Sequence, residues 1–309
     1  MKNTVQPKKT ILITGATGLI GKRLVKDYAH KGWKVICLVR NKKKAKKEFV
    51  GLSITIVVDL MELPQTVIIN AVVNLAGMPI SSGLWTKARK EKILNSRLHT
   101  TRQVMELLKY LNKKPDIIIQ GSACGYYGHG GNIELDEIAP PTEIFMSTLC
   151  QKWEKECEDH LPETTRMVSL RLGVVLARDA KAFKQLKLPM SLGLGAVLGS
   201  GDQYFPWIHI DDVISAIEFA INNKNLCGAI NLVVPEALSQ KQFSQKFAKA
   251  LNRPLFISVP AFVLRAALGE LSDLFLLGQR AIPEKLVNHN FVFRYSSLNK
   301  ALDNLVCLK

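Results

Sequence analysis

The chain has 309 residues, of which 47% are hydrophobic, so it is long enough for one large or two modest domains with full cores. It has no run of 18 or more apolar residues, which argues against a membrane span. The net charge is +16, and residues 40–49 (RNKKKAKKEF) carry much of the excess. Such a run is usually a solvated surface, and the lack of interleaved aromatic residues argues against nucleic acid as a partner.

Five short apolar runs alternate with helix-length segments in the first half of the chain. Continuous apolar runs are typical of parallel strands that helices cover on both faces. Helices are predicted after the first run, ending at Gly32, and over residues 86–111 and 145–160, with a sixth strand at 166–176. The pattern therefore predicts an α/β fold, a doubly wound parallel sheet of the Rossmann type. The five runs are residues 10–14, 34–39, 54–58, 71–76 and 116–122.

The regular alternation stops after residue 176. Residues 188–207 are rich in glycine and are predicted to form a loop, and residues 261–277 are predicted to form one apolar helix. We expect a smaller, mostly helical C-terminal lobe that binds the substrate. The predicted boundaries assign residues 8–176 and 205–235 to the dinucleotide-binding domain, and residues 177–204 and 236–309 to the smaller lobe.

The six cysteines form no CxxC pair and have no metal-ligand spacing with histidine. The basic residues 1–10 are not followed by the long apolar core of a signal peptide. Together these features predict a cytoplasmic protein with reduced thiols and no metal site. The cysteines are Cys37, Cys124, Cys150, Cys157, Cys227 and Cys307.

A glycine motif, TGATGLIG, lies between the first strand and the first helix. The first glycine permits a tight turn, the second permits close approach of a pyrophosphate, and the third permits close packing of helix on strand. The helix N-terminus favours the negative charge. The residues expected to bind the dinucleotide here are Gly15, Thr17, Gly18, Leu19, Ile20 and Gly21.

The end of the second strand indicates which dinucleotide binds. NAD-specific folds usually place an Asp or Glu there, to accept a hydrogen bond from the ribose 2′-OH. This strand instead ends in Val39 and Arg40, and a guanidinium suits a 2′-phosphate. We therefore favour NADP(H) over NAD(H), with the alternative that Arg40 is simply part of a basic loop.

With these pieces placed, the chain resembles the extended short-chain dehydrogenase/reductases, the NAD-dependent epimerase/dehydratase family. It is most similar to an epimerase-like subgroup with a distinctive C-terminal segment, whose members are often labelled sugar-nucleotide epimerases or SulA-type cell-division inhibitors. The resemblance extends from residue 10 to residue 295. The matching stretches are ILITGATGLIG, VVNLAGMPISSGLWT, SACGYYG, RLGVVL, LGSGDQYFPWIHIDDV and PAFVLRAALGE.

The resemblance implies roles for individual positions. Ser122 would lie near the reacting oxygen of the substrate, and Asp211 would cap a helix after His209. Relatives often dimerise through two long helices, which leaves a homodimer open here. The positions implied to contact the cofactor are Asp59 and Leu60 at the adenine, Leu75, Ala76 and Gly77 at the ribose, and Arg171 at the nicotinamide side.

One departure from the family concerns the proton donor. The family's tyrosine and lysine, four residues apart, correspond to Met146 and Cys150 in FMSTLCQKWE. Tyr126 and Tyr127 are the best substitutes for the tyrosine, ahead of Cys150 and of a loop histidine, His129. The missing pair puts ordinary epimerase or reductase chemistry in question.

Four further residues are expected at the cleft between the lobes, where they would contact substrate or merely pack the lobes together. They are Trp85, Arg97, Tyr204 and Trp207. The leading hypothesis is an NADP(H)-dependent, epimerase-like oxidoreductase acting on a small polar substrate, for which a sugar nucleotide is one candidate. The alternative is a non-catalytic NADP(H) sensor that acts through a protein partner.

Overall fold

The computed structural model describes residues 8–306. The strands are β1 (Thr10–Thr14), β2 (Lys34–Leu38), β3 (Ile54–Val57), β4 (Ala71–Asn74), β5 (Ile117–Ala123), β6 (Glu134–Leu135), β7 (Arg166–Leu172), β8 (Val174–Leu176), β9 (Ala196–Leu198), β10 (Trp207–His209), β11 (Gly228–Leu232), β12 (Ile257–Val259) and β13 (Arg280–Ala281). The α-helices are α1 (Leu19–His30), α2 (Lys42–Glu48), α3 (Lys87–Tyr110), α4 (Phe145–Glu158), α5 (Lys181–Ser191), α6 (Ile210–Asn222), α7 (Gln240–Ala250), α8 (Ala261–Leu268), α9 (Asp273–Leu276), α10 (Glu284–Asn288) and α11 (Leu298–Val306). Three 3₁₀ turns are η1 (Leu60–Glu62), η2 (Cys124–Tyr127) and η3 (Gly269–Ser272).

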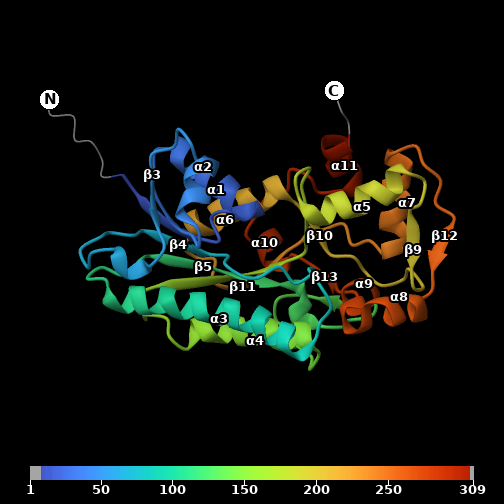
Figure 1. Ribbon diagram of the computed structural model, residues 1–309, viewed down its shortest axis with the longest axis horizontal. Helices are drawn as coiled ribbons and strands as arrows, with labels where there is room; N and C mark the ends of the chain where they lie inside the picture. The colour runs from blue at the N-terminus through green and yellow to red at the C-terminus, as the bar shows by residue number, and fades with distance from the viewer. Residues whose placement is uncertain (1–7, 307–309) are drawn as a thin grey trace.

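Seven strands form one parallel sheet in the order β11-β7-β5-β4-β1-β2-β3. The chain runs outward from β1 to β3, returns to β4 on the other side of β1, and then continues to β11. The strand order thus reverses between β1 and β4, and open α/β sheets bind ligands outside the carboxyl ends of the strands at such a point. The predicted doubly wound Rossmann sheet is confirmed (Figure 1).

Alternate residues of the strands face two separate cores. Ile11 and Ile13 of β1 pack on the side of α1 and α6, whereas Leu12 between them packs on the side of α3. Figure 1 shows α1 and α6 over one face of the sheet and α3 and α4 along the other. Because side chains alternate across a strand, strands covered on both faces are apolar throughout, which is the pattern that the sequence shows.

A smaller, mainly helical part of the chain lies at the end of the molecule away from β3 (Figure 1). It contains α7, α8 and the parallel pair of β9 and β12. Phe183 of α5 stacks on Phe247 of α7 with ring centroids 5.5 Å apart, within a core that is continuous with that of the sheet. The division of the chain into two domains at the predicted boundaries stays a prediction. No helix within residues 8–306 is long and apolar enough to cross a membrane.

The predicted loop at residues 188–207 is partly regular structure. It contains the last turn of α5, in which Pro189 is tolerated, and the strand β9. Ala196 of β9 pairs with Ile257 of β12, a partner far away in the sequence. The glycines and the proline suggested irregular structure. The strand β9 was missed because the strand that stabilises it, β12, lies in another segment of the chain.

Two other predicted elements are interrupted at glycines. The strand expected over residues 166–176 divides at Gly173, where a Cβ would lie 2.9 Å from the carbonyl of Pro206, and β8 leaves the sheet to pair with β10. The helix expected over residues 261–277 breaks at Gly269, whose φ of +55° ends α8. A left-handed glycine is a common helix terminator.

The start of α6 corrects the predicted cap. His209, not Asp211, is the N-cap residue, because its Nδ1 accepts a hydrogen bond from the Asp211 amide at 3.1 Å. Burial lowers the pKa of His209, which keeps Nδ1 available as an acceptor. Asp212, on the next position, is buried and accepts from the amides of Arg294 and Tyr295, so it ties α6 to the C-terminal segment.

Candidate functional site

The turn between β1 and α1 is built on close backbone contacts. Gly15 has φ +65°, and a Cβ on it would lie 2.9 Å from the carbonyl carbon of Leu75. A Cβ on Gly21 would lie 2.3 Å from the carbonyl oxygen of Gly15. Gly18 caps α1 without a side-chain hydrogen bond, and the first turn of the helix has no acidic residue. The first amides of α1 therefore face a place where an anionic pyrophosphate fits.

A buried polar network fixes the strand ends around this turn. Thr14 Oγ1 donates to Asn74 Oδ1 at 2.6 Å and accepts from the amides of Leu75 and Ala76, both at 3.1 Å. Asn74 Nδ2 donates in turn to Gln120 Oε1 at 2.8 Å. The network holds the segment after β4 against Gly15. Thr14 and Gln120 were not predicted, although polar residues inside otherwise apolar strands were a signal for them.

The residues expected at the adenosine end lie at the ends of β2 and β3. Arg40 is exposed two residues after the end of β2, and its guanidinium has no hydrogen bond or ion pair within residues 8–306. Asp59 is the N-cap of η1, and its carboxylate accepts from the Met61 amide at 2.9 Å. Leu60 is buried below it. Arg40 and Asp59 thus lie just after the carboxyl ends of β2 and β3, the two strands next to β1 and its glycine turn.

A cavity of about 400 Å³ adjoins the carboxyl ends of β5 and β7 and is closed by α4 and by the C-terminal part of the chain. Six residues predicted at the cofactor or substrate line this one cavity, and so do Met146 and Cys150 at the positions of the missing tyrosine and lysine. The walls of the cavity are mainly apolar, whereas the small polar substrate that was expected would need mainly polar walls. The six residues are Ile20, Leu75, Trp85, Arg97, Ser122 and Tyr204.

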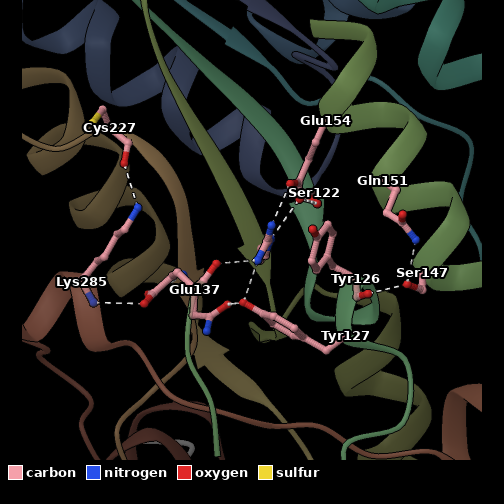
Figure 2. A network of polar contacts seen from close by, with 11 residues as sticks. Ser122, Tyr126, Tyr127, Glu137, Ser147, Gln151, Glu154, Cys227 and Lys285 are labelled. Atoms are coloured by element: carbon pink, nitrogen blue, oxygen red, sulfur yellow. Dashed lines mark hydrogen bonds and ion pairs between the residues drawn. The ribbon is translucent and has the colours of Figure 1, made fainter. Parts of the chain in front are cut away.

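Ser122 belongs to a buried ion-pair network (Figure 2). Its hydroxyl donates to Glu154 Oε1 at 2.5 Å, and the Glu154 carboxylate accepts two hydrogen bonds from Arg171, at 3.1 and 3.0 Å. Burial alone would lower the pKa of the Arg171 guanidinium, but hydrogen bonds and Coulombic attraction from Glu154 more than offset it, so this pKa is raised. Ser122 therefore presents its oxygen to the cavity as an acceptor, since its one proton is already donated.

The network also engages the groups predicted for catalysis and cofactor binding. Arg171 donates to the Tyr127 hydroxyl at 3.0 Å and to the Glu137 carbonyl at 3.1 Å, and its side chain is buried; its predicted place at the nicotinamide side stays a prediction. The Tyr127 hydroxyl donates to Asn231 Oδ1 at 2.6 Å, and burial raises its pKa. Tyr126 lies flat against Arg171, with the guanidinium carbon 3.4 Å from the ring centroid.

Neither Tyr126 nor Tyr127 is among the described residues that line the cavity, which argues against either of them as the proton donor. The assignment of that role stays a prediction. Glu154 and Glu137 were not predicted to be functional or structural centres. The signal for Glu154 was a carboxylate on the buried stripe of a helix, beside Cys150 and Trp153. A charge in that position needs a buried partner of opposite charge. The partner, Arg171, lies on β7 and not on the same helix, so the local sequence does not identify it.

The aromatic residues at the cavity divide into two groups. Trp85 lines the cavity, donates from Nε1 to the Ile80 carbonyl at 2.9 Å and meets Phe145 edge to face, with centroids 5.0 Å apart. Tyr204 lines the opposite, C-terminal side. Trp207 is instead only 1% exposed, inside the main core, which favours the packing alternative over contact with a substrate.

Cysteine labelling tests the position of Cys150. Burial raises the pKa of this thiol to about 12, and it does the same for Cys37 and Cys157. At pH 8, iodoacetamide should therefore modify exposed Cys227 while the four buried described thiols stay unmodified, as peptide mass spectrometry would show. Labelling in urea should reach all of them. Native labelling of Cys150 as fast as Cys227 would restore it as an acid/base candidate; Cys307 lies outside the described residues.

Residues 8–306 contain no group of three His, Cys, Asp or Glu side chains arranged to hold a metal ion. The site is thus defined by the glycine turn, the charged edge of the sheet and the aromatic cavity. Fold and turn together describe a Rossmann-type protein whose sheet edge fits a dinucleotide.

Comparison with known proteins gives the family. Residues 11–232 match the NAD dependent epimerase/dehydratase family, and residues 259–305 match a domain of unknown function, DUF1731. The chain belongs to the NAD dependent epimerase/dehydratase family, as the resemblance of its motifs implied. The second match covers the distinctive C-terminal segment.

Relatives are similar over nearly the whole chain. Epimerase family protein YfhF of Bacillus subtilis is 35% identical over 300 residues, covering 96% of this chain and 97% of that protein. The chloroplastic SDR39U1 homolog of Arabidopsis thaliana is 33% identical, covering 96% of this chain and 86% of that protein. The crystal structure of human epimerase family protein SDR39U1 (isoform2) with NADPH is 31% identical, with a TM-score of 0.85 and coverage of 96% and 98%.

Proposed function

We propose that the protein is an NADP(H)-dependent oxidoreductase that binds its dinucleotide along the carboxyl edge of the sheet and a small molecule in the adjoining cavity. The observation that carries this proposal is the glycine turn, whose α1 begins without a side-chain cap, combined with Arg40 and no acidic residue at the end of β2. The human relative crystallised with NADPH supports NADP(H) over NAD(H). When bound, NADP(H) supplies the hydride chemistry.

The residues of this chain would hold the dinucleotide in three places. Amides at the start of α1 would bind the pyrophosphate, because the helix end carries partial positive charge there. Arg40 would pair with the 2′-phosphate, and Asp59 would lie at the adenine. Leu75, at the cavity, would pack against the nicotinamide half.

Ser122 would orient the substrate by accepting a hydrogen bond. Its proton is donated to Glu154, so its oxygen suits a substrate hydroxyl or amine better than a carbonyl. Proton exchange would fall to a group other than Tyr126 and Tyr127. The acid/base side chains that line the cavity in the described chain are Tyr204 and Asp273, besides the high-pKa thiols.

Arg40→Ala tests the cofactor assignment. Loss of one charge-assisted contact to a phosphate should weaken NADPH binding by roughly tenfold to a hundredfold and leave NADH binding unchanged. Fluorescence titration with both nucleotides measures this ratio. Lys46→Ala, in the same basic region but in the last turn of α2, is the control and should change neither affinity appreciably. Equal weakening of NADPH and NADH binding, or no NADPH binding to the unchanged protein, would contradict the proposal.

A second candidate is a protein that binds NADP(H) without turnover and acts through a partner. It is favoured by one observation: among residues 8–306, neither a lysine nor either of the two neighbouring tyrosines lines the cavity beside Ser122. Stopped-flow measurement of NADPH absorbance distinguishes the two. Oxidation in the presence of any member of a carbonyl-compound panel supports the oxidoreductase, whereas tight binding with no oxidation, and a cofactor-dependent partner, supports the sensor.

A further inference from the structure

Arg97 is a cation on the cavity wall whose charge is not neutralised by a carboxylate in the part of the chain that the structure describes. It lies on α3, and its Nη1 donates to the carbonyls of Met78 and Ile93 at 3.1 and 3.0 Å. Within residues 8–306, the buried Nε has no hydrogen-bond partner, Nη2 makes no hydrogen bond, and no ion pair involves the residue. A buried donor without a partner calls for an explanation, such as a ligand that the site is built to bind.

The guanidinium is held in place by its surroundings. Its carbon lies 5.0 Å from the ring centroid of Trp153, and a Cβ on Gly77 would lie 3.0 Å from the same atom. These contacts remove water, and this desolvation lowers the pKa of Arg97 to about 10. The side chain remains charged at neutral pH. The protein thus keeps a partly desolvated cation in a fixed position, which costs folding free energy unless a ligand compensates for it.

The rest of the cavity limits what that ligand can be. Beyond Arg97, the one other charged side chain lining it in the described chain is Asp273, which would repel a second negative group. Burial and the neighbouring Glu270 both raise the pKa of Asp273, in keeping with a site that lacks spare positive charge. Trp85 and Phe145 form an apolar wall between them. A nucleoside diphosphate, with two adjacent negative charges, lacks the cations it would need here.

We propose that the cavity binds a monocarboxylate with an apolar body, whose carboxylate pairs with Arg97 and whose body packs between Trp85, Phe145 and Met146. The proposal rests on the proposed function, since it names the substrate class of the same cavity. A single guanidinium matches one carboxylate in charge, and its Nη2 supplies the free donor. A further donor group on the ligand would meet the Ser122 oxygen.

Paired ligands test this on the intact protein. Cinnamate and hexanoate are compared by isothermal titration calorimetry with cinnamamide and hexanamide, which keep the shape but lose the charge, in the presence and absence of NADP⁺. Each carboxylate should bind roughly tenfold or more tighter than its amide, as expected for one charge-assisted hydrogen bond in a partly desolvated site. UDP-glucose should bind more weakly than either carboxylate. Arg97→Gln should abolish the preference for the acid, and Arg97→Lys should keep part of it.

Arg89→Gln is the matched control, because Arg89 lies on the same helix but binds Ser82 outside the cavity, and it should leave the preference unchanged. Equal affinity for acid and amide, binding of neither acid, or tighter binding of UDP-glucose would each overturn the proposal. The comparison in the unchanged chain stands even if Arg97→Gln fails to fold. If the carboxylate test fails and NADPH also fails to bind the unchanged chain, the proposed function is overturned. If the carboxylate test fails but NADPH binds normally, only the carboxylate assignment is overturned.

Discussion

Replacing Gly15 with alanine is expected to abolish dinucleotide binding. The new side chain would have to adopt φ +65°, which costs roughly 1–2 kcal/mol for a residue other than glycine. Its Cβ would also lie 2.9 Å from the Leu75 carbonyl, a backbone group that can move only with β4, so overpacking adds roughly 1–3 kcal/mol. The turn must therefore open. Because the first amides of α1 depend on the turn for their direction, NADPH affinity should fall below detection in a fluorescence titration.

Gly32→Ala is the control that separates the cost of a left-handed φ from the cost of a steric clash. Gly32 has φ +79°, yet nothing lies within 4 Å of a Cβ built there. The free energy of unfolding of this variant, measured in urea, should fall only by the cost of the left-handed backbone conformation, and the variant should bind NADPH normally. If Gly15→Ala binds NADPH as well as Gly32→Ala does, the glycine turn is not the pyrophosphate site, and the cofactor assignment loses its main support.

Arg171→Leu is expected to destabilise the protein by about 3–5 kcal/mol, because it leaves a buried carboxylate without its partner. The side chains of Arg171 and Glu154 are 6% and 8% exposed. The substitution also removes the hydrogen bonds from Arg171 to Tyr127 and to the Glu137 carbonyl. Urea denaturation followed by circular dichroism measures the loss. Glu154→Leu in the same chain should recover part of it, because the unpaired charge is then gone.

The pair of Arg102 and Glu156 provides the comparison. Arg102 donates to both carboxylate oxygens of Glu156, each at 2.9 Å, so the bidentate geometry resembles that of the buried pair. Arg102 is exposed, and solvent screens the interaction, so Arg102→Leu should change the unfolding midpoint little. An equally small change for Arg171→Leu would show that the buried network does not hold β5, β7 and α4 together.

The buried pair also bears on the missing tyrosine and lysine. Where the family places a proton donor, this chain has Met146 against Gly125, and Cys150 is a buried thiol. The polar partners of Ser122 are instead Glu154, which accepts its proton, and Arg171, which binds the same carboxylate. Ser122 is therefore held as an acceptor by a carboxylate rather than by a phenol, which changes the kind of substrate group it can bind.

The sequence by itself determined the α/β class, the five strands before residue 124, the glycine turn and the Rossmann sheet. These features depend on residues close together in the chain, so the apolar runs and the Gly15, Gly18 and Gly21 spacing are read directly. Local reasoning, together with the family resemblance that gave Leu75 and Ser122, identified six residues that line the cavity. The resemblance to the family also showed that Met146 and Cys150 stand on α4 where the family has its tyrosine and lysine.

Only the tertiary structure decided which side chains are free to act. Tyr126 and Tyr127 are engaged by Arg171 from β7, and Trp207 is covered by the core, although their sequence neighbours suggested a site. Arg97 keeps its charge unpaired because no carboxylate of the described residues 8–306 forms an ion pair with it, and its buried Nε has no partner there. Pairing, burial and the loss of water depend on segments far apart in the chain, and such contacts leave no local pattern in the sequence.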